Sequence, residues 1–180
     1  MASIKSILSP FDSSTIQQLQ AGEQVEIHGT IYGMRDAAHK RLIESMERND
    51  PAPVDLAGQV IYYVGPAPAK PGHAIGPAGP TTSGRMDPYT IQMLKIGVKG
   101  FIGKGYRSPE IKEAMIEHQA VYLAAIGGAA ALLAKTIIES KIIAYPDLGP
   151  EAIYAFKVQG FPAIVVNDVQ GRDAYQRSNH

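Results

Sequence analysis

Residues 76–87 read Gly-Pro-Ala-Gly-Pro-Thr-Thr-Ser-Gly-Arg-Met-Asp, and they predict a loop around which the rest of the chain is organised. Proline fixes φ and glycine permits backbone conformations that other residues avoid, so this loop has a definite shape. A helix from Met86 to Leu94 is expected to follow, with Thr82 or Ser83 as its cap. Hydroxyls, an arginine and the free N–H groups of a helix start together suit a carboxylate or phosphate. The alternative is a surface loop whose hydroxyls only cap the helix.

The segments on either side of the loop carry strand and helix patterns. Residues 60–64 and 98–103 are short apolar runs, which predict buried strands before and after the loop. Residues 25–31 alternate apolar and polar side chains, as a half-buried strand does. Because some neighbouring strands lack a helix between them, the order predicts an α/β domain with a mixed sheet flanked by helices. The other predicted strands are 121–126, 141–145, 155–158 and 161–166, and the other predicted helices are 14–19, 36–46 capped by Asp36, 108–118 capped by Ser108, and one that begins at 127.

Length and composition bound the class of protein. The 180 residues, 45% of them hydrophobic, predict a single domain over 1–180, with an N-terminal extension over 1–20 and a polar tail over 171–180. Seventeen basic residues balance seventeen acidic ones without any run of like charge, which argues against nucleic acid and membrane partners. The sequence has no cysteine, so it offers no disulfide, thiol nucleophile or thiolate ligand. With no signal-peptide pattern and no apolar stretch long enough to span a bilayer, a cytoplasmic location is expected.

Three basic residues lie at the ends of predicted strands. Arg35 follows the strand at 25–31, Arg85 lies in the loop, and Lys104 follows the strand at 98–103 between two glycines. If these strand ends meet at one edge of the sheet, the three cations converge there. Two arginines can bind the two carboxylates of a small dicarboxylate bidentately, and a lysine adds a point charge. The alternative for each residue is a solvated turn or first helical turn.

Five short motifs follow one another over about residues 20–170. They are Gly29-Thr30-Ile31 with Arg35-Asp36-Ala37-Ala38-His39, Tyr63-Val64-Gly65-Pro66, Gly79-Pro80-Thr81-Thr82-Ser83-Gly84-Arg85-Met86, Ile102-Gly103-Lys104-Gly105, and Phe161-Pro162-Ala163-Ile164-Val165. In this order they resemble the β subunit, or carboxy-terminal domain, of class I iron–sulfur fumarate hydratases and the related L-tartrate dehydratases. The resemblance implies a swivelling β/β/α-type domain, with an active site where it meets a larger α part.

The same resemblance implies how the work is divided between subunits. A 4Fe-4S cluster would be held by three cysteines of the partner α subunit, with one iron open as a Lewis acid, and this chain would bind no metal. The absence of cysteine agrees with that division. It further implies that the chain is inactive alone and that it joins a hetero-oligomer of two α and two β subunits. An exposed apolar face is expected to mark the surface that contacts the α subunit.

The resemblance also assigns roles to individual residues. Arg35, Arg85 and Lys104 would bind the carboxylates of fumarate or malate. Thr81 would contact the substrate near its reacting carbons as a proton acceptor or relay, although a threonine hydroxyl is a weak base without an activating neighbour. A second set is expected to shape the loop, orient Arg35 or support the structure, and it consists of Asp36, Thr82 and His39.

The reaction that the resemblance implies is the reversible hydration of fumarate to L-malate. One alternative is the β subunit of L-tartrate dehydratase, because the extra substrate hydroxyl would be recognised by the α subunit. An alternative of another class is a non-catalytic anion-binding or assembly module that keeps the fold. A neighbouring reading frame for an α subunit with three cysteines would favour either enzyme over the module.

Overall fold

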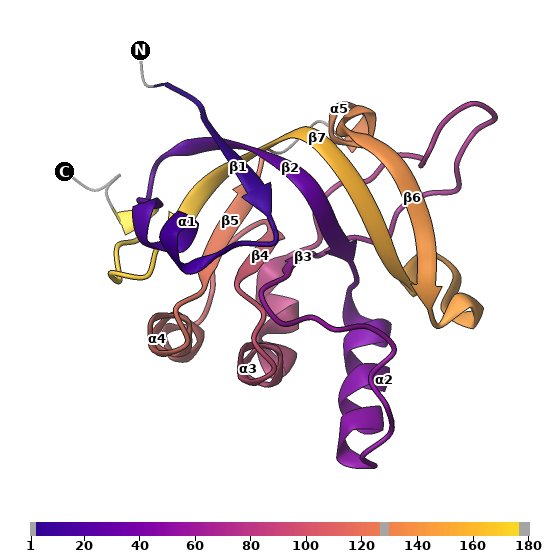
Figure 1. Cartoon of the computed structure of the whole chain (residues 1–180), viewed down its shortest axis with the longest axis horizontal. Helices are drawn as coiled ribbons and strands as arrows, with labels where there is room; N and C mark the ends of the chain where they lie inside the picture. Colours follow the sequence, from indigo (N-terminus) through magenta and orange to yellow (C-terminus); the bar gives the residue numbers. More distant parts are fainter. Residues whose placement is uncertain (1–2, 127–129, 177–180) are drawn as a thin grey trace.

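The computed structural model describes residues 3–126 and 130–176, which form a curved sheet with helices packed against it (Figure 1). The strands are β1 (Lys5–Ser9), β2 (Gln24–Gly33), β3 (Val60–Tyr62), β4 (Gly100–Gly103), β5 (Val121–Ala125), β6 (Ile137–Ala144) and β7 (Ile153–Asn167). The α-helices are α1 (Ser13–Gln18), α2 (Asp36–Glu47), α3 (Asp87–Lys95), α4 (Pro109–Glu117) and α5 (Ala130–Thr136), and the 3₁₀ helices are η1 (Ser83–Met86) and η2 (Pro146–Glu151).

The sheet is mixed and closes on itself. β1 to β5 are parallel to their neighbours, whereas β7 runs antiparallel to β5, β6 and β2. Because β7 pairs with both β5 and β2, the strands β2, β3, β4, β5 and β7 form a closed five-stranded barrel. β1 and β6 extend the sheet beside β2 and β7. The mixed α/β fold is therefore confirmed, and the closed barrel is a feature that the sequence analysis missed.

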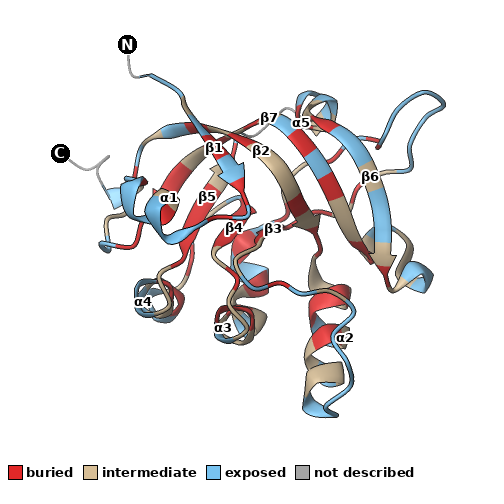
Figure 2. Ribbon diagram, in the orientation of Figure 1, coloured by how far each residue is buried: buried red, intermediate tan, exposed pale blue. Residues whose placement is uncertain are grey.

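The two faces of the sheet each bury a separate hydrophobic core. Val60 and Tyr62 of β3 point into one core, together with side chains from the other barrel strands, whereas Ile61 and Tyr63 pack in the second core with residues of α2, α3 and α4. This alternation explains the continuous apolar run at residues 60–64, because both faces of a central parallel strand are covered. Figure 1 shows α2, α3 and α4 side by side below the sheet, and Figure 2 shows the central strands buried.

The strands β6 and β7 differ from the sequence prediction. The two short strands expected at 155–158 and 161–166 are one strand, β7, and β6 begins at Ile137 rather than at 141. Gly160, which lies between the two predicted strands, adopts a φ of 70° and donates its N–H to His28 Nδ1 at 3.2 Å, where the pairing with β2 shifts register. A glycine at positive φ in this position forms a bulge within the strand rather than an end to it.

Two of the three predicted helix caps are wrong. The N-cap of α2 is Arg35, and Asp36 lies inside the helix with its carboxylate turned to Arg85. Neither Thr82 nor Ser83 caps α3, because the turn η1 comes first and the N-cap of α3 is Met86. The Ser108 cap of α4 is confirmed by a hydrogen bond that Ile111 N donates to its hydroxyl at 3.3 Å.

Both ends of the described chain lie on the side of the molecule where β1 and α1 are found (Figure 1). Within the predicted N-terminal extension, β1 pairs with β2 and the side chains of Ile7, Phe11 and Ile16 are buried. In the predicted polar tail, Asp173 accepts a hydrogen bond from Lys112 Nζ at 3.0 Å.

The predicted Gly127-Gly128 helix start lies outside the described residues. Among the helices of residues 3–126 and 130–176, none is long and apolar enough to cross a membrane.

Candidate active site

The predicted site residues lie at the carboxyl ends of three adjacent parallel strands. Arg35 follows β2, the loop that carries Thr81 follows β3, and Lys104 follows β4. Thr81 N donates to the carbonyl of Tyr63 at 2.7 Å, which fastens the loop to the end of β3. In parallel α/β sheets, whether open or closed into a barrel, ligands bind outside this end of the strands. The three strand ends therefore lie side by side, which is the condition for a shared site; the convergence of the three cations on one ligand stays a prediction.

Four side chains of alternating charge connect the end of β2 with two distant segments. Arg85 Nη2 donates to Asp36 Oδ2 at 2.8 Å, and the same oxygen lies 4.0 Å from Arg35 Nε. Arg35 Nε donates in turn to Glu151 Oε1 at 3.1 Å. Arg85, Asp36, Arg35 and Glu151 thus form a row of two guanidinium groups and two carboxylates, which we call the charge row. Asp36 was predicted to orient Arg35. In the structure it lies between the two arginines, and its closer partner is Arg85.

The loop and the end of β4 are joined by backbone hydrogen bonds. Ser83 N donates to the carbonyl of Lys104 at 2.8 Å, and Lys104 N donates to the carbonyl of Thr81 at 3.3 Å. Thr82 and Lys104 therefore pair as an isolated parallel bridge. Thr81 is only 8% exposed, whereas the side chain of Lys104 reaches solvent. The backbone of the loop at Thr81 therefore runs alongside the end of β4 at Lys104.

A buried hydroxyl relay and a glycine allow the loop to approach β4. Ser83 Oγ donates to the Tyr122 hydroxyl at 2.8 Å, and that hydroxyl donates to the carbonyl of Gly105 at 2.8 Å. A Cβ atom at Gly103 would overlap Ser83 Oγ and lie 2.9 Å from a ring carbon of Tyr63. Glycine at 103 is needed for this close contact between backbone and loop. The hydroxyl of Ser83 is therefore used to dock the loop rather than to cap a helix.

Arg107 is a buried residue that the sequence analysis missed. Its guanidinium, with a side chain 0% exposed, donates to Asp87 at 2.8 Å, to the Tyr63 hydroxyl at 2.9 Å and to Thr90 Oγ1 at 2.5 Å. It also lies between 5.3 and 5.6 Å from the ring centroids of Tyr63, Phe101 and Tyr122. Arg107 ties the first residue of α3, two positions after Arg85, to the core below the site. No local sequence pattern predicts a buried contact of this kind.

His39 lies beneath the charge row and is fully buried. Its Nδ1 lies 2.8 Å from the carbonyl of Arg35, and because a carbonyl only accepts, Nδ1 carries the proton. The ring stacks on Tyr89 at a centroid distance of 5.6 Å and meets Tyr63 edge-on at 5.7 Å. Burial lowers the pKa of His39 to about 4, so the ring is neutral at pH 7. Its contacts to the backbone of Arg35 fit the expected supporting role.

The buried, neutral His39 is expected to make the fold sensitive to acid. Its pKa is about 4 in the folded chain against an ordinary value of 6.5, so the unfolded chain binds the proton first as the pH falls. Stability is complete above about pH 6.5 and declines towards pH 4, by up to about 3 kcal/mol from this group. Urea denaturation at pH 7 and pH 4.5 should show a smaller loss for His39→Phe than for the natural chain. His73→Gln replaces an exposed histidine and is the control, so it should lose as much stability on acidification as the natural chain. An equally large loss for His39→Phe would contradict this assignment.

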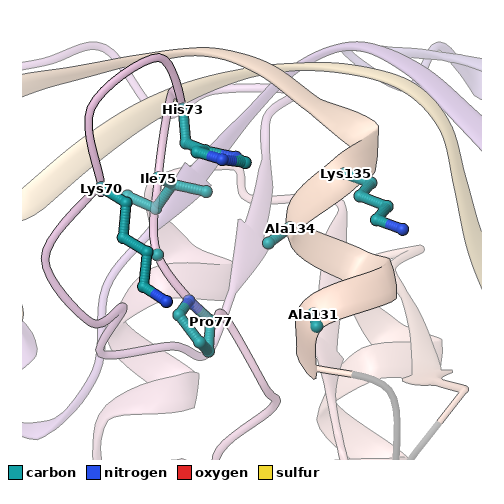
Figure 3. Close-up of a pocket in the computed structure, with 8 residues that line it drawn as sticks. Lys70, His73, Ile75, Pro77, Ala131, Ala134 and Lys135 are labelled. Atoms are coloured by element: carbon teal, nitrogen blue, oxygen red, sulfur yellow. The ribbon is translucent and has the colours of Figure 1, made fainter.

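A pocket of about 190 Å³ opens at a different place, between the loop before residue 78 and α5 (Figure 3). In Figure 3, the side chains of His73 and Ile75 point from the loop towards Ala134 of α5. The full set of lining residues is Lys70, His73, Ile75, Gly76, Pro77, Ala131, Ala134 and Lys135. None of the predicted site residues lines it, so the charge row and Thr81 belong to a separate surface.

Few side chains of this chain suit a metal ion or cluster. The sequence contains no cysteine. Across residues 3–126 and 130–176, no three His, Asp or Glu side chains lie close enough together to hold a metal. The basic and hydroxyl groups at the strand ends are instead suited to carboxylates. The donor set of this chain therefore does not fit an iron–sulfur cluster.

Fold and site together define an α/β barrel domain that presents arginines and hydroxyls at the carboxyl ends of its parallel strands. Residues 6–178 match the family model described as Fumarase C-terminus, and the chain belongs to this family. The resemblance noted in the sequence is thereby confirmed at the level of the family.

The relatives include both hydratases and a dehydratase subunit. The chain is 39% identical to "Fumarate hydratase 2" of Leishmania major, over 91% of the chain and 29% of the relative. It is also 39% identical to "Fumarate hydratase class I, aerobic" of Escherichia coli K12, over 90% of the chain and 30% of the relative. It is 35% identical to "Putative L(+)-tartrate dehydratase subunit beta" of Methanocaldococcus jannaschii, over 91% of the chain and 87% of that protein. The chain thus spans less than a third of the two hydratases and most of the subunit.

Proposed function

We propose that this chain is the β subunit of a class I hydro-lyase that hydrates fumarate reversibly to L-malate, and that it acts with a cluster-bearing α subunit. The observation that carries the proposal is the convergence of Arg35 and Arg85 on Asp36 beside the Thr81 loop, in a chain of the Fumarase C-terminus family. Two class I or related fumarate hydratases are 39% identical to it. The β-subunit assignment is supported by the M. jannaschii relative, whose name denotes a separate subunit.

In this proposal the two arginines bind the two carboxylates of the substrate. The side chain of Arg85 is 53% exposed and that of Arg35 is 32% exposed, so both guanidinium groups are accessible from solvent. Lys104 adds a third positive charge beside the loop. Removal of the proton next to a carboxylate places extra negative charge on that carboxylate, and fixed cations stabilise it in the transition state. Thr81 would contact the reacting carbons and relay the proton.

The Lewis acid that this chemistry calls for would be a 4Fe-4S cluster held by the α subunit. This chain has no cysteine and no cluster of suitable ligands among its described residues, so its own part is limited to binding, orienting and charge stabilisation. The chain alone is accordingly proposed to be inactive. The assembly of two α and two β subunits, the swivelling β/β/α type, the single-domain boundaries and the cytoplasmic location stay predictions.

The outer face of α5 and β6 is our candidate for the contact with the α subunit. Leu132, Ile138 and Ile142 are 60%, 45% and 43% exposed, and between its two buried end residues β6 is exposed or intermediate (Figure 2). β6 also lies at the edge of the sheet, beyond β7. A second pocket is lined by Ile142 of this face together with Pro66 and Pro150, and Pro150 directly precedes Glu151 of the charge row in the chain. Exposed apolar side chains at a sheet edge are typical of surfaces that a partner covers.

The first experiment measures fumarate hydration by this chain without oxygen, with and without a co-expressed α subunit that carries cysteines. Activity is expected only for the pair, because the residues that bind substrate and those that hold the cluster lie on different chains. Activity of the chain alone would contradict the division of labour. A pair with a fully assembled cluster but no activity on fumarate or tartrate would favour the non-catalytic anion-binding or assembly module.

The β subunit of L-tartrate dehydratase is the second candidate. The M. jannaschii relative, named as such a subunit, is matched over 87% of its length, whereas the hydratases are matched over less than a third. The described site provides cations for two carboxylates and does not distinguish fumarate from tartrate. The same pair should be assayed with both substrates, and the larger kcat/KM identifies the enzyme.

A further inference from the structure

We propose that Glu151 is a positioning residue for Arg35, holding its guanidinium so that the Nη groups face the substrate; this inference rests on the proposed function. Glu151 Oε1 accepts a hydrogen bond from Arg35 Nε at 3.1 Å and lies 3.4 Å from the N–H of Ala37. The carboxylate comes from the end of η2, 116 positions along the chain from Arg35. It thus supplies the first turn of α2 with a side-chain acceptor, which Arg35 as N-cap does not provide.

The guanidinium of Arg35 is fixed on two sides. A Cβ atom at Gly65 would lie 2.8 Å from Nη1, 3.0 Å from Cζ and 3.1 Å from Nε, so the group packs directly against this glycine. Glu151 occupies the Nε–H on another side. Among the described residues, the two Nη groups form no hydrogen bond. Because a guanidinium has five N–H donors, the four on Nη1 and Nη2 are left to bind a carboxylate in a bidentate manner.

The segment that carries Glu151 is itself held against α2. Arg41 Nη1 donates to Asp147 Oδ1 at 2.7 Å, and the Arg41 guanidinium lies 5.1 Å from the ring centroid of Tyr145. Tyr145 and Gly149 both have a φ of 57°, so η2 is a tight turn rather than a continuous helix. Two ion pairs therefore hold η2 against α2 and its N-cap, one through Asp147 and one through Glu151. Only the second involves a residue of the site.

The two pairs make a matched experiment, because both join η2 to α2 by an arginine and a carboxylate. The side chains of Arg35 and Glu151 are each 32% exposed, and an ion pair at such a position contributes little to stability. Loss of Glu151 should therefore be seen in substrate binding more than in unfolding. Loss of Asp147 should be seen in neither, since its partner Arg41 does not belong to the charge row.

In the complex with its α subunit, Glu151→Ala is expected to lower kcat/KM by about 10- to 100-fold, mainly through KM, because a hydrogen bond to a charged group is lost. Glu151→Gln keeps an oxygen that accepts from Nε and should recover most of this loss. Gly65→Ala should also raise KM, since its methyl group displaces the Arg35 guanidinium. Asp147→Asn is the control and should keep natural kinetics. Natural kinetics for Glu151→Ala, or an equal loss for Asp147→Asn, would overturn the inference.

Two further measurements separate this inference from the proposed function. Arg35→Ala should abolish most of the activity, and if it does not, the proposed function fails. If Arg35→Ala is inactive but Glu151→Ala keeps natural kinetics, only the positioning role of Glu151 is refuted. In the chain by itself, the ¹⁵N signal of Arg35 Nε–H should show slow hydrogen exchange that is lost in Glu151→Ala and kept in Asp147→Asn. Fast exchange in the natural chain would overturn the inference whatever the activity.

Discussion

Arg85→Ala in the assembled enzyme is expected to lower kcat/KM by about 10²- to 10³-fold. The side chain is 53% exposed and its only described ion pair is with Asp36, so its removal takes away an accessible cation that, in our proposal, binds the substrate. Loss of one fixed donor to developing negative charge has an effect of that order on the rate of an enzyme. The free energy of unfolding should hardly change, because an exposed ion pair contributes at most about 1 kcal/mol.

Two variants make the Arg85 result specific. Arg85→Lys retains the charge without the planar fork, so it should recover only part of the activity. Arg48→Ala removes another exposed arginine, which forms an ion pair with Asp50 at 2.9 Å and does not belong to the site. This variant should leave the kinetics unchanged. Near-natural activity of Arg85→Ala would show that the substrate does not bind at the charge row. A large fall in stability would show that the effect is on the fold.

Arg107→Met is expected to destabilise the chain by about 3 kcal/mol, the largest effect of a substitution on stability that we predict. The side chain of Arg107 is fully buried, and its removal leaves the Asp87 carboxylate, 18% exposed, without its cation. The hydroxyls of Tyr63 and Thr90 lose their donor at the same time. Removing one member of a buried pair costs about 3–5 kcal/mol, because the other charge stays buried and unpaired.

Urea denaturation of Arg107→Met at pH 7 measures this cost. Arg48→Met is the matched control, since it replaces an exposed arginine with the same side chain and should change stability by no more than about 0.5 kcal/mol. A loss below 1 kcal/mol for Arg107→Met would mean that the buried network contributes little. Because Asp87 lies two residues after Arg85, the variant should also weaken substrate binding by loosening the loop.

Much of the candidate site was predictable because it depends on local chemistry. The loop at 76–87 has a shape set by its prolines and glycines, and the structure fastens it to Tyr63 and Lys104 by backbone hydrogen bonds. Arg35 and Lys104 were predicted at strand ends, where the structure places them. The caps by Asp36 and by Thr82 or Ser83 were wrong, because Asp36 and Ser83 have tertiary partners, Arg85 and Tyr122, that outweigh the local preference.

The sequence by itself determined the family, several strands with charged residues at their ends, and the absence of cysteine ligands. Periodicity, glycine and proline positions act between neighbouring residues, so they can be recognised without the fold. Only the tertiary structure decided the barrel closure by β7, the buried position of Arg107 and the contact between Glu151 and Arg35. These depend on residues far apart in the chain, up to 116 positions for the last pair. Contacts of this kind form only when packing brings distant segments together, and no local pattern encodes them.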